Sequence, residues 1–397
     1  MGKLDLKELG LRLSSLTIFR NLLSDPVLES LCHYLDAQSI DRYAAFVASL
    51  YEANGGRLGE YIRDICENNE NVYVRTVGSG GVVPQYLTAT LLEELKTLQT
   101  VADLTSQQLR QPLEYSGFLP EFSSGNLNLA ECFTHRVENI GKYGYGIYAK
   151  NRMFYVDEQN CIVPVKHPDN TELCDLVDYH AQRNVILDNT KALLSGKPAA
   201  NILLTGDAGT GKSSTVKAVG NALYSEGLRI IEVRKDQLRA IPKILDALSA
   251  NPLKFVLFID DLSFLKDDDN FNALKAVLEG SVTAKSKNVV IYATSNRRHM
   301  IKEKFSDREG DDVHRNDTIQ ELVSLSERFG IHITFSKPDK ETFLHIVRHL
   351  AKMDGIELPT EELELKAERF ALERGGRSAR LARQFIDGLL SDTDGRE

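Results

Sequence analysis

The sequence lacks any long apolar run. The longest strongly apolar run near a motif covers residues 255–259. This is far short of the roughly 20 residues that a helix needs to cross a bilayer. The first twenty residues contain no apolar core of a secretory signal, because charged side chains interrupt their leucines at Lys3, Asp5, Lys7 and Glu8. We therefore expect a cytoplasmic protein with no membrane partner.

Paired cysteines and an excess of positive charge are also missing. The five cysteines are odd in number and lack the spacing of a metal site: Cys32, Cys66, Cys132, Cys161 and Cys174. We expect reduced thiols that pack as small apolar groups. Lys and Arg number 48 against 57 Asp and Glu, a net charge of -9. This charge repels phosphate backbones, so it does not indicate a nucleic-acid partner, although a local basic patch would still allow one.

The composition is that of a globular protein, with 42% apolar and 26% charged residues. A length of 397 residues favours two or three domains. Residues 1–140 read as helices separated by glycine-bearing breaks, with 26–52 as one helical stretch. Strand and helix patterns alternate over 171–337, which predicts an α/β fold with a parallel five-stranded sheet between helices. Residues 338–397 carry only helical periods and predict a small helical domain.

The segment between these regions changes pattern. Residues 141–170 predict a β-hairpin connector, with strands at 147–149 and 153–156. At its start, three glycines and two tyrosines are interspersed over 141–146, with Lys142 after the first glycine. This run fits either a tight turn or a loop that stacks on a purine or grips a peptide.

One segment of the α/β region fits the phosphate-loop pattern GxxxxGK[ST], with a strand expected before it and a helix after it. It consists of Gly206, Asp207, Ala208, Gly209, Thr210, Gly211, Lys212 and Ser213, and Ser214 follows. Its glycines allow backbone N–H groups to curve around phosphate oxygens beside the positive end of a helix. We expect Lys212 to neutralise the β and γ phosphates of ATP and the Ser213 hydroxyl to hold Mg²⁺.

Polar side chains follow two further apolar strands. The strand at 255–259 ends at Asp260 and Asp261. We expect Asp260 to hold Mg²⁺ through water and Asp261 to orient and polarise the attacking water. Asn296 follows a strand at 289–294 and would position that water if this strand lies beside the first. Acids that cap a turn, or an asparagine that forms one, are the structural alternatives.

The order of these motifs resembles that of the AAA+ ATPases over about residues 165–390. The strings at 259–264, 293–299, 325–330 and 375–380 resemble in particular an uncharacterised bacterial family of predicted AAA+ ATPases. The resemblance implies that 171–337 is a P-loop nucleotide-binding core, that the helical tail is its lid, and that the protein forms a homo-oligomer.

Two arginines gain roles from this resemblance. It implies that Arg328, just before the fifth strand, reaches the nucleotide of a neighbouring subunit; the alternative is a surface pair with Glu327 or Glu321. Arg380 lies near the start of the last helix, where a cation is unfavourable unless an anion such as phosphate compensates. We expect Arg380 to act as the sensor of the lid, with Arg377 as the substitute candidate.

The sequence thus predicts an ATP-hydrolysing AAA+ protein, either a remodelling ATPase or a helicase-loader-like factor, whose unknown protein or nucleoprotein client binds residues 1–140. The alternative is a slow ATP-gated switch or scaffold. The separate tail domain and Arg328 disfavour a small-molecule kinase. Residues 235–248 lack the aromatic-apolar-glycine loop of threading rings, and the basic cluster at 297–304 reads as a mixed-sign solvated loop rather than a binding site for DNA or an acidic partner.

Overall fold

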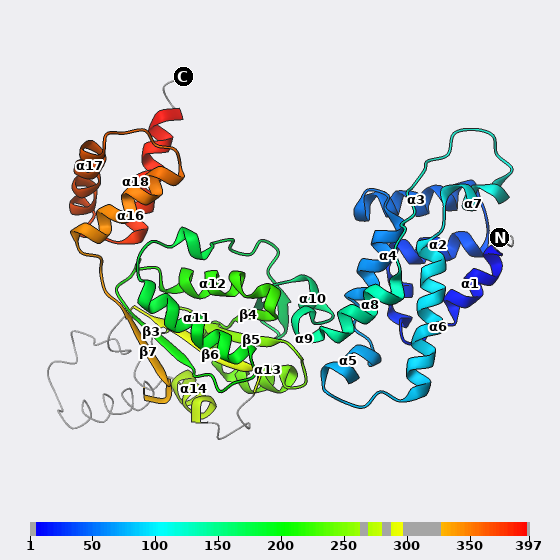
Figure 1. Cartoon of the computed structure of the whole chain (residues 1–397), viewed down its shortest axis with the longest axis horizontal. Helices are drawn as coiled ribbons and strands as arrows, with labels where there is room; N and C mark the ends of the chain where they lie inside the picture. The colour runs from blue at the N-terminus through cyan, green and yellow to red at the C-terminus, as the bar shows by residue number, and fades with distance from the viewer. Residues whose placement is uncertain (1–4, 263–268, 280–286, 297–326, 395–397) are drawn as a thin grey trace. The chain divides into compact units, whose positions relative to one another are not determined.

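The computed structural model describes residues 5–262, 269–279, 287–296 and 327–394 (Figure 1). It divides into two compact units. The first consists of Met1–Lys150 with Ala250–Pro252, and the second of Asn151–Ser249 with Leu253–Glu397. The first unit is helical and the second contains the sheet.

Several helices of the first unit begin at a side chain that accepts hydrogen bonds from the N–H groups of the first turn. Asp5, Asp25 and Ser39 cap three of them in this way. Because Ser39 starts a new helix, the helical stretch expected over 26–52 is two helices. The helices are α1 (Leu6–Ser14), α2 (Pro26–Asp36), α3 (Ile40–Asn54), α4 (Leu58–Glu67), α5 (Val72–Gly78), α6 (Gln85–Ala102), α7 (Ser106–Arg110), α8 (Leu129–Glu138), α9 (Ile140–Tyr143) and α10 (Ile147–Lys150).

A buried carboxylate fastens the segment after α1 to α6. Glu94 is only 6% exposed, and its two oxygens accept hydrogen bonds from the backbone N–H groups of Thr17, Ile18 and Phe19 at 2.7–3.1 Å. The Thr17 hydroxyl adds a further hydrogen bond at 2.6 Å. A carboxylate only accepts, so it matches a group of donors that would otherwise be buried without partners.

We expect Glu94→Gln to lower the free energy of unfolding of the first unit by about 2 kcal/mol, because the new amide NH₂ would face N–H donors and leave one of them unsatisfied. Urea unfolding of the full chain, followed by the helical signal, measures this change. Glu93→Gln is the matched control, since Glu93 is exposed and its one ion pair in the described part of the chain is with Lys96 at the surface; its unfolding midpoint should equal that of the parent chain. Equal midpoints for all three proteins would contradict the role of Glu94.

The glycine-tyrosine run forms turns of the first unit. Gly144 and Gly146 have positive φ angles of 67° and 60°, a conformation that favours glycine. Tyr145 is buried in the core of this unit, and the guanidinium of Arg136 lies 4.9 Å from the ring centre of Tyr143. The tight-turn interpretation therefore describes this run.

The prediction of a strand at 147–149 is wrong, because Ile147–Lys150 is helix α10. The hairpin lies further along, between β1 (Met153–Val156) and β2 (Ile162–Pro164). It belongs to the second unit, where β1 pairs in parallel with β4 (Leu228–Glu232). The hairpin thus extends the main sheet instead of forming a separate connector.

The second unit is built around a seven-stranded sheet in the order β2-β1-β4-β5-β6-β3-β7. Every neighbouring pair except β1 with β2 is parallel. The predicted α/β fold with five parallel strands is confirmed, and the hairpin adds two strands at one edge. The remaining strands are β3 (Ile202–Gly206), β5 (Lys254–Ile259), β6 (Val289–Ser295) and β7 (Ile331–Phe335).

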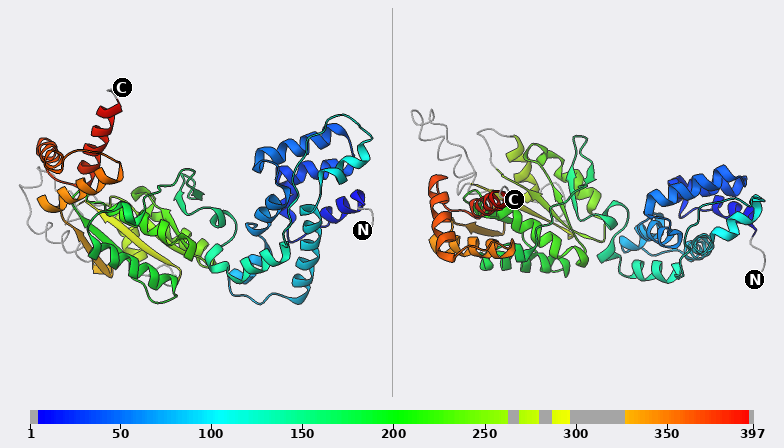
Figure 2. Two further views of the ribbon diagram at one scale, coloured as in Figure 1. Left: turned by 45° about the horizontal axis from the view of Figure 1, so that its top comes forward. Right: turned by 90° about the horizontal axis from the view of Figure 1, so that it is seen from above.

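Helices cover both faces of this sheet (Figure 2). On one face, Ile186 of α11 (His180–Leu194) and Val216 of α12 (Lys212–Ala222) share a core cluster with strand residues such as Ile202. On the other face lie α13 (Ile241–Leu248) and α14 (Asp269–Glu279). Strand β5 is consequently buried on both sides, as is usual for a parallel sheet.

The C-terminal part of the second unit is a three-helix lid with a core of its own. It consists of α16 (Lys340–Met353), α17 (Thr360–Glu373) and α18 (Ala379–Asp394). Asp339 caps α16 by accepting a hydrogen bond from Thr342 N–H at 2.8 Å. None of the described helices is both long and apolar enough to span a bilayer.

The cysteines differ in their surroundings. Cys66 is buried, and its burial raises the pKa of the thiol, so this residue packs as the sequence predicts. Cys161 and Cys174 are exposed. For these two the prediction of packed thiols is wrong, because Cys161 lies in a loop and Cys174 in a short 3-10 helix (Leu173–Asp175), both outside the core of the second unit.

Candidate nucleotide-binding site

The predicted motifs meet at one edge of the sheet. Strand β6 lies between β3 and β5, so the three carboxyl ends are neighbours. The phosphate loop follows β3, Asp260 and Asp261 follow β5, and Asn296 follows β6. Parallel strands place their carboxyl ends together, where α/β proteins bind ligands. The condition set for Asn296, a strand beside the first, is met.

Glycine is required at two positions of the phosphate loop. Gly206 has a φ of 137°, and a Cβ there would lie 2.0 Å from the carbonyl oxygen of Phe335. Gly211 has a φ of 89° and precedes the first turn of α12. The loop therefore passes close to β7 at its start and turns sharply into the helix at its end.

The Lys212 side chain is folded into this loop. It is 5% exposed, and Nζ donates to the carbonyl oxygens of Gly206 and Asp207 at 3.0 and 2.7 Å and to Oδ1 of Asn296 at 3.0 Å. Burial lowers the pKa of its ammonium group. An ammonium held by neutral oxygens gains from an anionic ligand, since phosphate oxygens favour the charged form.

The residues predicted to hold Mg²⁺ form a connected hydrogen-bonded group. Asp260 Oδ1 accepts from the hydroxyls of Ser213 and Thr294 at 2.6 and 2.5 Å. Hydroxyl and carboxylate oxygens are the ligands that Mg²⁺ prefers, so this donor set fits the ion. Thr294 was not among the predicted site residues. It is 2% exposed, and its position as the next-to-last residue of an apolar strand could have indicated that it belongs to the site.

Asp261 and Asn296 contact each other beside Lys212. The amide of Asn296 donates to Asp261 Oδ1 at 2.8 Å. Asp261 has a positive φ of 51°, and its N–H donates to Oδ1 of Asp260 at 3.1 Å and to Oγ1 of Thr294 at 3.0 Å. A non-glycine residue adopts this conformation at an energetic cost, and here hydrogen bonds from two neighbouring strand ends fix it.

These side chains open into a cavity of about 610 Å³ that the core and the lid share. The core contributes Asp260, Asp261, Asn296 and most of the phosphate loop: Ala208, Gly209, Thr210, Gly211, Lys212, Ser213 and Ser214. The lid contributes Ile346 and Leu350 of α16 and Arg380 of α18. The cavity therefore combines a polar end with apolar side chains.

The first turn of α18 contacts the phosphate loop directly. The N–H of Arg380 donates to the carbonyl oxygen of Gly209 at 3.2 Å, and the Arg380 side chain lines the cavity. Arg377 instead forms a two-point ion pair with Glu368 of α17, at 2.8 and 2.7 Å. Of the two sensor candidates, Arg380 lies at the nucleotide cavity and Arg377 is paired within the lid.

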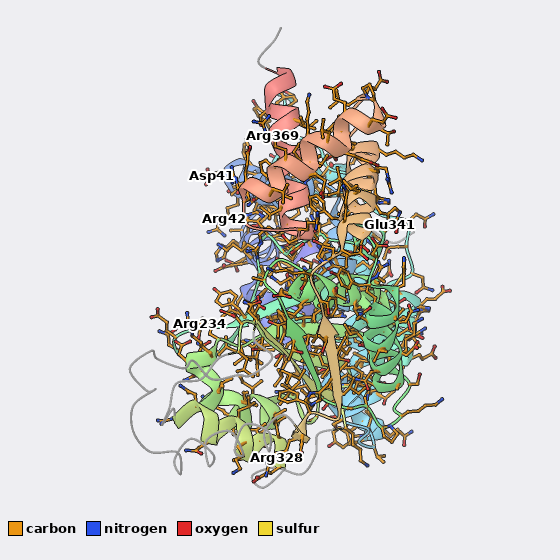
Figure 3. All side chains as sticks on the ribbon, turned by 90° about the vertical axis from the view of Figure 1, so that its left-hand side faces the viewer. Asp41, Arg42, Arg234, Arg328, Glu341 and Arg369 are labelled. Carbon is orange, nitrogen blue, oxygen red and sulfur yellow. The ribbon has the colours of Figure 1, made fainter. Side chains whose placement is uncertain are left out.

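Arg328 lies before the amino end of β7 (Figure 3), whereas the phosphate loop of the same chain follows the carboxyl end of the neighbouring strand β3. Ile331, three residues further on, pairs with Ile202 at the start of β3, whereas Gly206 at the end of β3 pairs with Phe335. This register separates the two sites by roughly 13 Å of strand. Arg328 forms an ion pair at 2.5 Å with Glu279; Glu321, one partner in the alternative, lies outside the described residues.

Two predicted segments also lie outside the described residues. These are Ser263 and Phe264 after the acidic pair, and the basic cluster at 297–304. The interpretation of that cluster therefore stays a prediction.

The fold and the site define an AAA+-type P-loop ATPase-like protein. More particularly, the chain belongs to the family described as "Protein of unknown function (DUF815)", whose model matches residues 149–393. The match includes the hairpin, the sheet and the lid. It confirms the resemblance drawn from the motifs.

Individual relatives are more distant. The chromosomal replication initiator protein DnaA of Pseudothermotoga lettingae is 25% identical over 182 residues, which are 43% of this chain and 37% of that protein. Two solved structures of mutant RuvB from Thermotoga maritima each have a TM-score of 0.38 and 16% identity, over 55% of this chain and 63% of theirs. The chain thus spans less than two thirds of the length of these relatives.

Proposed function

We propose that this protein binds ATP with Mg²⁺ and hydrolyses it. The observation that carries the proposal is the convergence of Lys212, Asp260 and Asn296 from three neighbouring strand ends on one cavity. A buried ammonium beside a glycine-rich loop and a helix N-terminus fits a triphosphate, and the Ser213–Asp260 pair at 2.6 Å fits its metal ion. Bound Mg²⁺ would neutralise charge on the phosphates.

Within this proposal each residue of the site has a separate role in binding or hydrolysing ATP. Asp261 lies next to Asn296 at the mouth of the loop, and its carboxylate accepts a proton from, and orients, the attacking water. Asn296 is proposed to position the same water, and its amide also holds the carboxylate of Asp261 in place. Arg380 is proposed to bind the phosphates from the lid, because its side chain lines the same cavity. Arg328 is proposed to act on the nucleotide of a neighbouring subunit in a homo-oligomer, since the length of β7 keeps it from its own.

For the cellular task we propose an oligomeric remodelling ATPase or helicase-loader-like factor that binds an unknown protein or nucleoprotein client through residues 1–140. The relative DnaA is a chromosomal replication initiator protein, which supports a nucleoprotein client. The alternative is a slow ATP-gated switch. Turnover that rises when a client or DNA is added favours the first function, and slow turnover that stays constant favours the second.

The test of nucleotide binding is Lys212→Ala. We expect it to weaken ATP binding roughly 100-fold, or about 2.7 kcal/mol, because the phosphates lose their one buried ammonium within the described part of the cavity. Isothermal titration of the full chain with ATP and Mg²⁺ measures the affinity.

Lys217→Ala is the matched control. Lys217 lies on the same helix, α12, and forms a partly exposed pair with Glu232 at 3.9 Å, so its removal should leave ATP affinity unchanged. Equal affinities for Lys212→Ala and the parent chain would overturn the proposed site. A parent chain that binds no adenine nucleotide would overturn the proposed function itself.

A further inference from the structure

A short segment before α11 forms one wall of the nucleotide cavity. We call residues 173–179 the wall segment; residues 175–179 line the cavity. At its end Asp178 and Tyr179 both have positive φ angles, 62° and 53°. Two consecutive non-glycine residues adopt this conformation only when their surroundings hold them there. The contacts that hold the segment therefore decide the shape of the wall.

The end of the wall segment is fixed by β7 and the lid. The Tyr179 hydroxyl donates to the carbonyl oxygen of Ser336 at 2.6 Å, and burial raises the pKa of Tyr179 to about 12, so this hydroxyl keeps its proton. The Tyr179 and Phe335 ring centres lie 5.2 Å apart. Asp178 pairs with His345 of α16 at 3.1 Å. These contacts do not hold the first part of the wall segment, which another residue holds.

That residue is Arg183, one turn into α11. Its side chain donates from Nη1 to the carbonyl oxygens of Leu173 and Leu176, at 2.8 and 2.6 Å, and from Nη2 to Nδ1 of His180 at 2.6 Å. Arg183 is 9% exposed. None of the three acceptors carries a negative charge, since two are backbone carbonyl oxygens and one is a ring nitrogen. Burial lowers the pKa of Arg183, although the carboxylate of Asp178 favours its charged form.

A buried cation among neutral acceptors is an unfavourable choice if its only task is to fill space, and an apolar side chain would pack there more cheaply. A guanidinium, however, is a planar fork with several N–H donors: Nη1 of Arg183 bonds both carbonyl groups while Nη2 bonds the ring of His180. Arg183 uses this geometry to join carbonyls three residues apart and so sets the backbone course of the wall segment.

The phosphate end of the cavity is defined by Lys212 and Ser213. The wall segment, with Ile346 and Leu350, therefore remains for the rest of the nucleotide. We propose that Arg183 is a positioning residue, which holds the wall segment in the conformation that contacts the base and ribose of the nucleotide. This inference rests on the proposed function, and it assigns Arg183 to affinity for the nucleoside part and not to the chemical step.

The test compares two ligands on one variant, Arg183→Met, which keeps the unbranched stem and removes the donors. We expect ATP affinity to fall about tenfold, while the affinity for inorganic tripolyphosphate, which has no nucleoside, stays unchanged. In turnover, KM for ATP should rise about tenfold while kcat stays the same. This is expected when the lost interaction stabilises the bound substrate and the transition state equally. Lys191→Met, an exposed lysine on the same helix, is the matched control and should change neither ligand.

Two results would overturn the role of Arg183. One is unchanged ATP affinity in a folded Arg183→Met protein; the other is an equal loss for ATP and tripolyphosphate, which marks a general packing role. If Arg183→Met does not fold, Arg183→Lys retains the cation but loses the fork, and the same two ligands decide. Failure of the parent chain to bind either ligand would instead refute the proposed function.

Discussion

ATP turnover should fall roughly 10³- to 10⁵-fold in Arg328→Ala, the range known for arginines that a neighbouring subunit supplies to a P-loop site. ATP affinity should change little, because Arg328 is separated from its own phosphate loop by the length of β7. Phosphate release at saturating ATP and Mg²⁺ measures turnover. The matched control is Arg369→Ala, an exposed arginine on α17 that pairs with Glu373 and should leave turnover unchanged.

Mixing experiments decide whether Arg328 acts between subunits. Lys212→Ala subunits cannot hold nucleotide but retain Arg328, whereas Arg328→Ala subunits hold nucleotide and lack the arginine. In a closed ring of randomly mixed subunits, about a quarter of the interfaces would combine an intact site with an intact arginine. We expect turnover to reappear on mixing two inactive proteins. Absence of rescue at every mixing ratio would rule out a shared site.

Asp261→Asn should retain ATP binding and lose hydrolysis by roughly 10²- to 10⁴-fold, the usual contribution of a positioned general base. The amide preserves size and can still contact Asn296, but it does not accept the proton of the attacking water. Titration with ATP gives the affinity and phosphate release gives the rate. Asp236→Asn is the control, because Asp236 is exposed and pairs only with Arg234 among the described residues.

The same variant offers a way to find the client. An ATP-bound protein that does not turn over should retain a partner that the parent chain releases, so tagged Asp261→Asn with ATP is the natural bait, and the same bait without nucleotide is its background. Normal hydrolysis in Asp261→Asn would refute the role given to its carboxylate.

The sequence predicts the core strands and the motifs at their ends well, because both follow local patterns. An apolar run that ends at Asp260, or a glycine loop before Lys212, is set by residues next to one another. That the strand ends meet follows from the rules for parallel sheets. The wrong prediction of a strand at 147–149 has a physical reason. Ile147 and Tyr148 have β propensity, but they follow Gly146, whose positive φ precedes a short helix, and so short a run carries no usable period.

Other features depend on contacts between distant residues and leave no motif. Glu94 meets backbone groups that are more than 70 residues away, and Arg183 contacts two carbonyl groups and the ring of His180 instead of an acidic side chain. Carbonyl acceptors exist at every residue, so the sequence does not reveal which ones a buried arginine selects. The choice between Arg380 and Arg377 likewise depended on the packing of α17, which brings Glu368 to Arg377.

The close approach at Gly206 has a mechanical consequence. Its α-carbon abuts the carbonyl oxygen of Phe335, the last residue of β7, and the chain continues from there through Ser336 to α16. The beginning of the phosphate loop and the connection from β7 to the lid thus meet at one junction. If the lid rotated about this junction, it would press on the loop through the backbone alone, so the loop would respond to that rotation before any side chain moved.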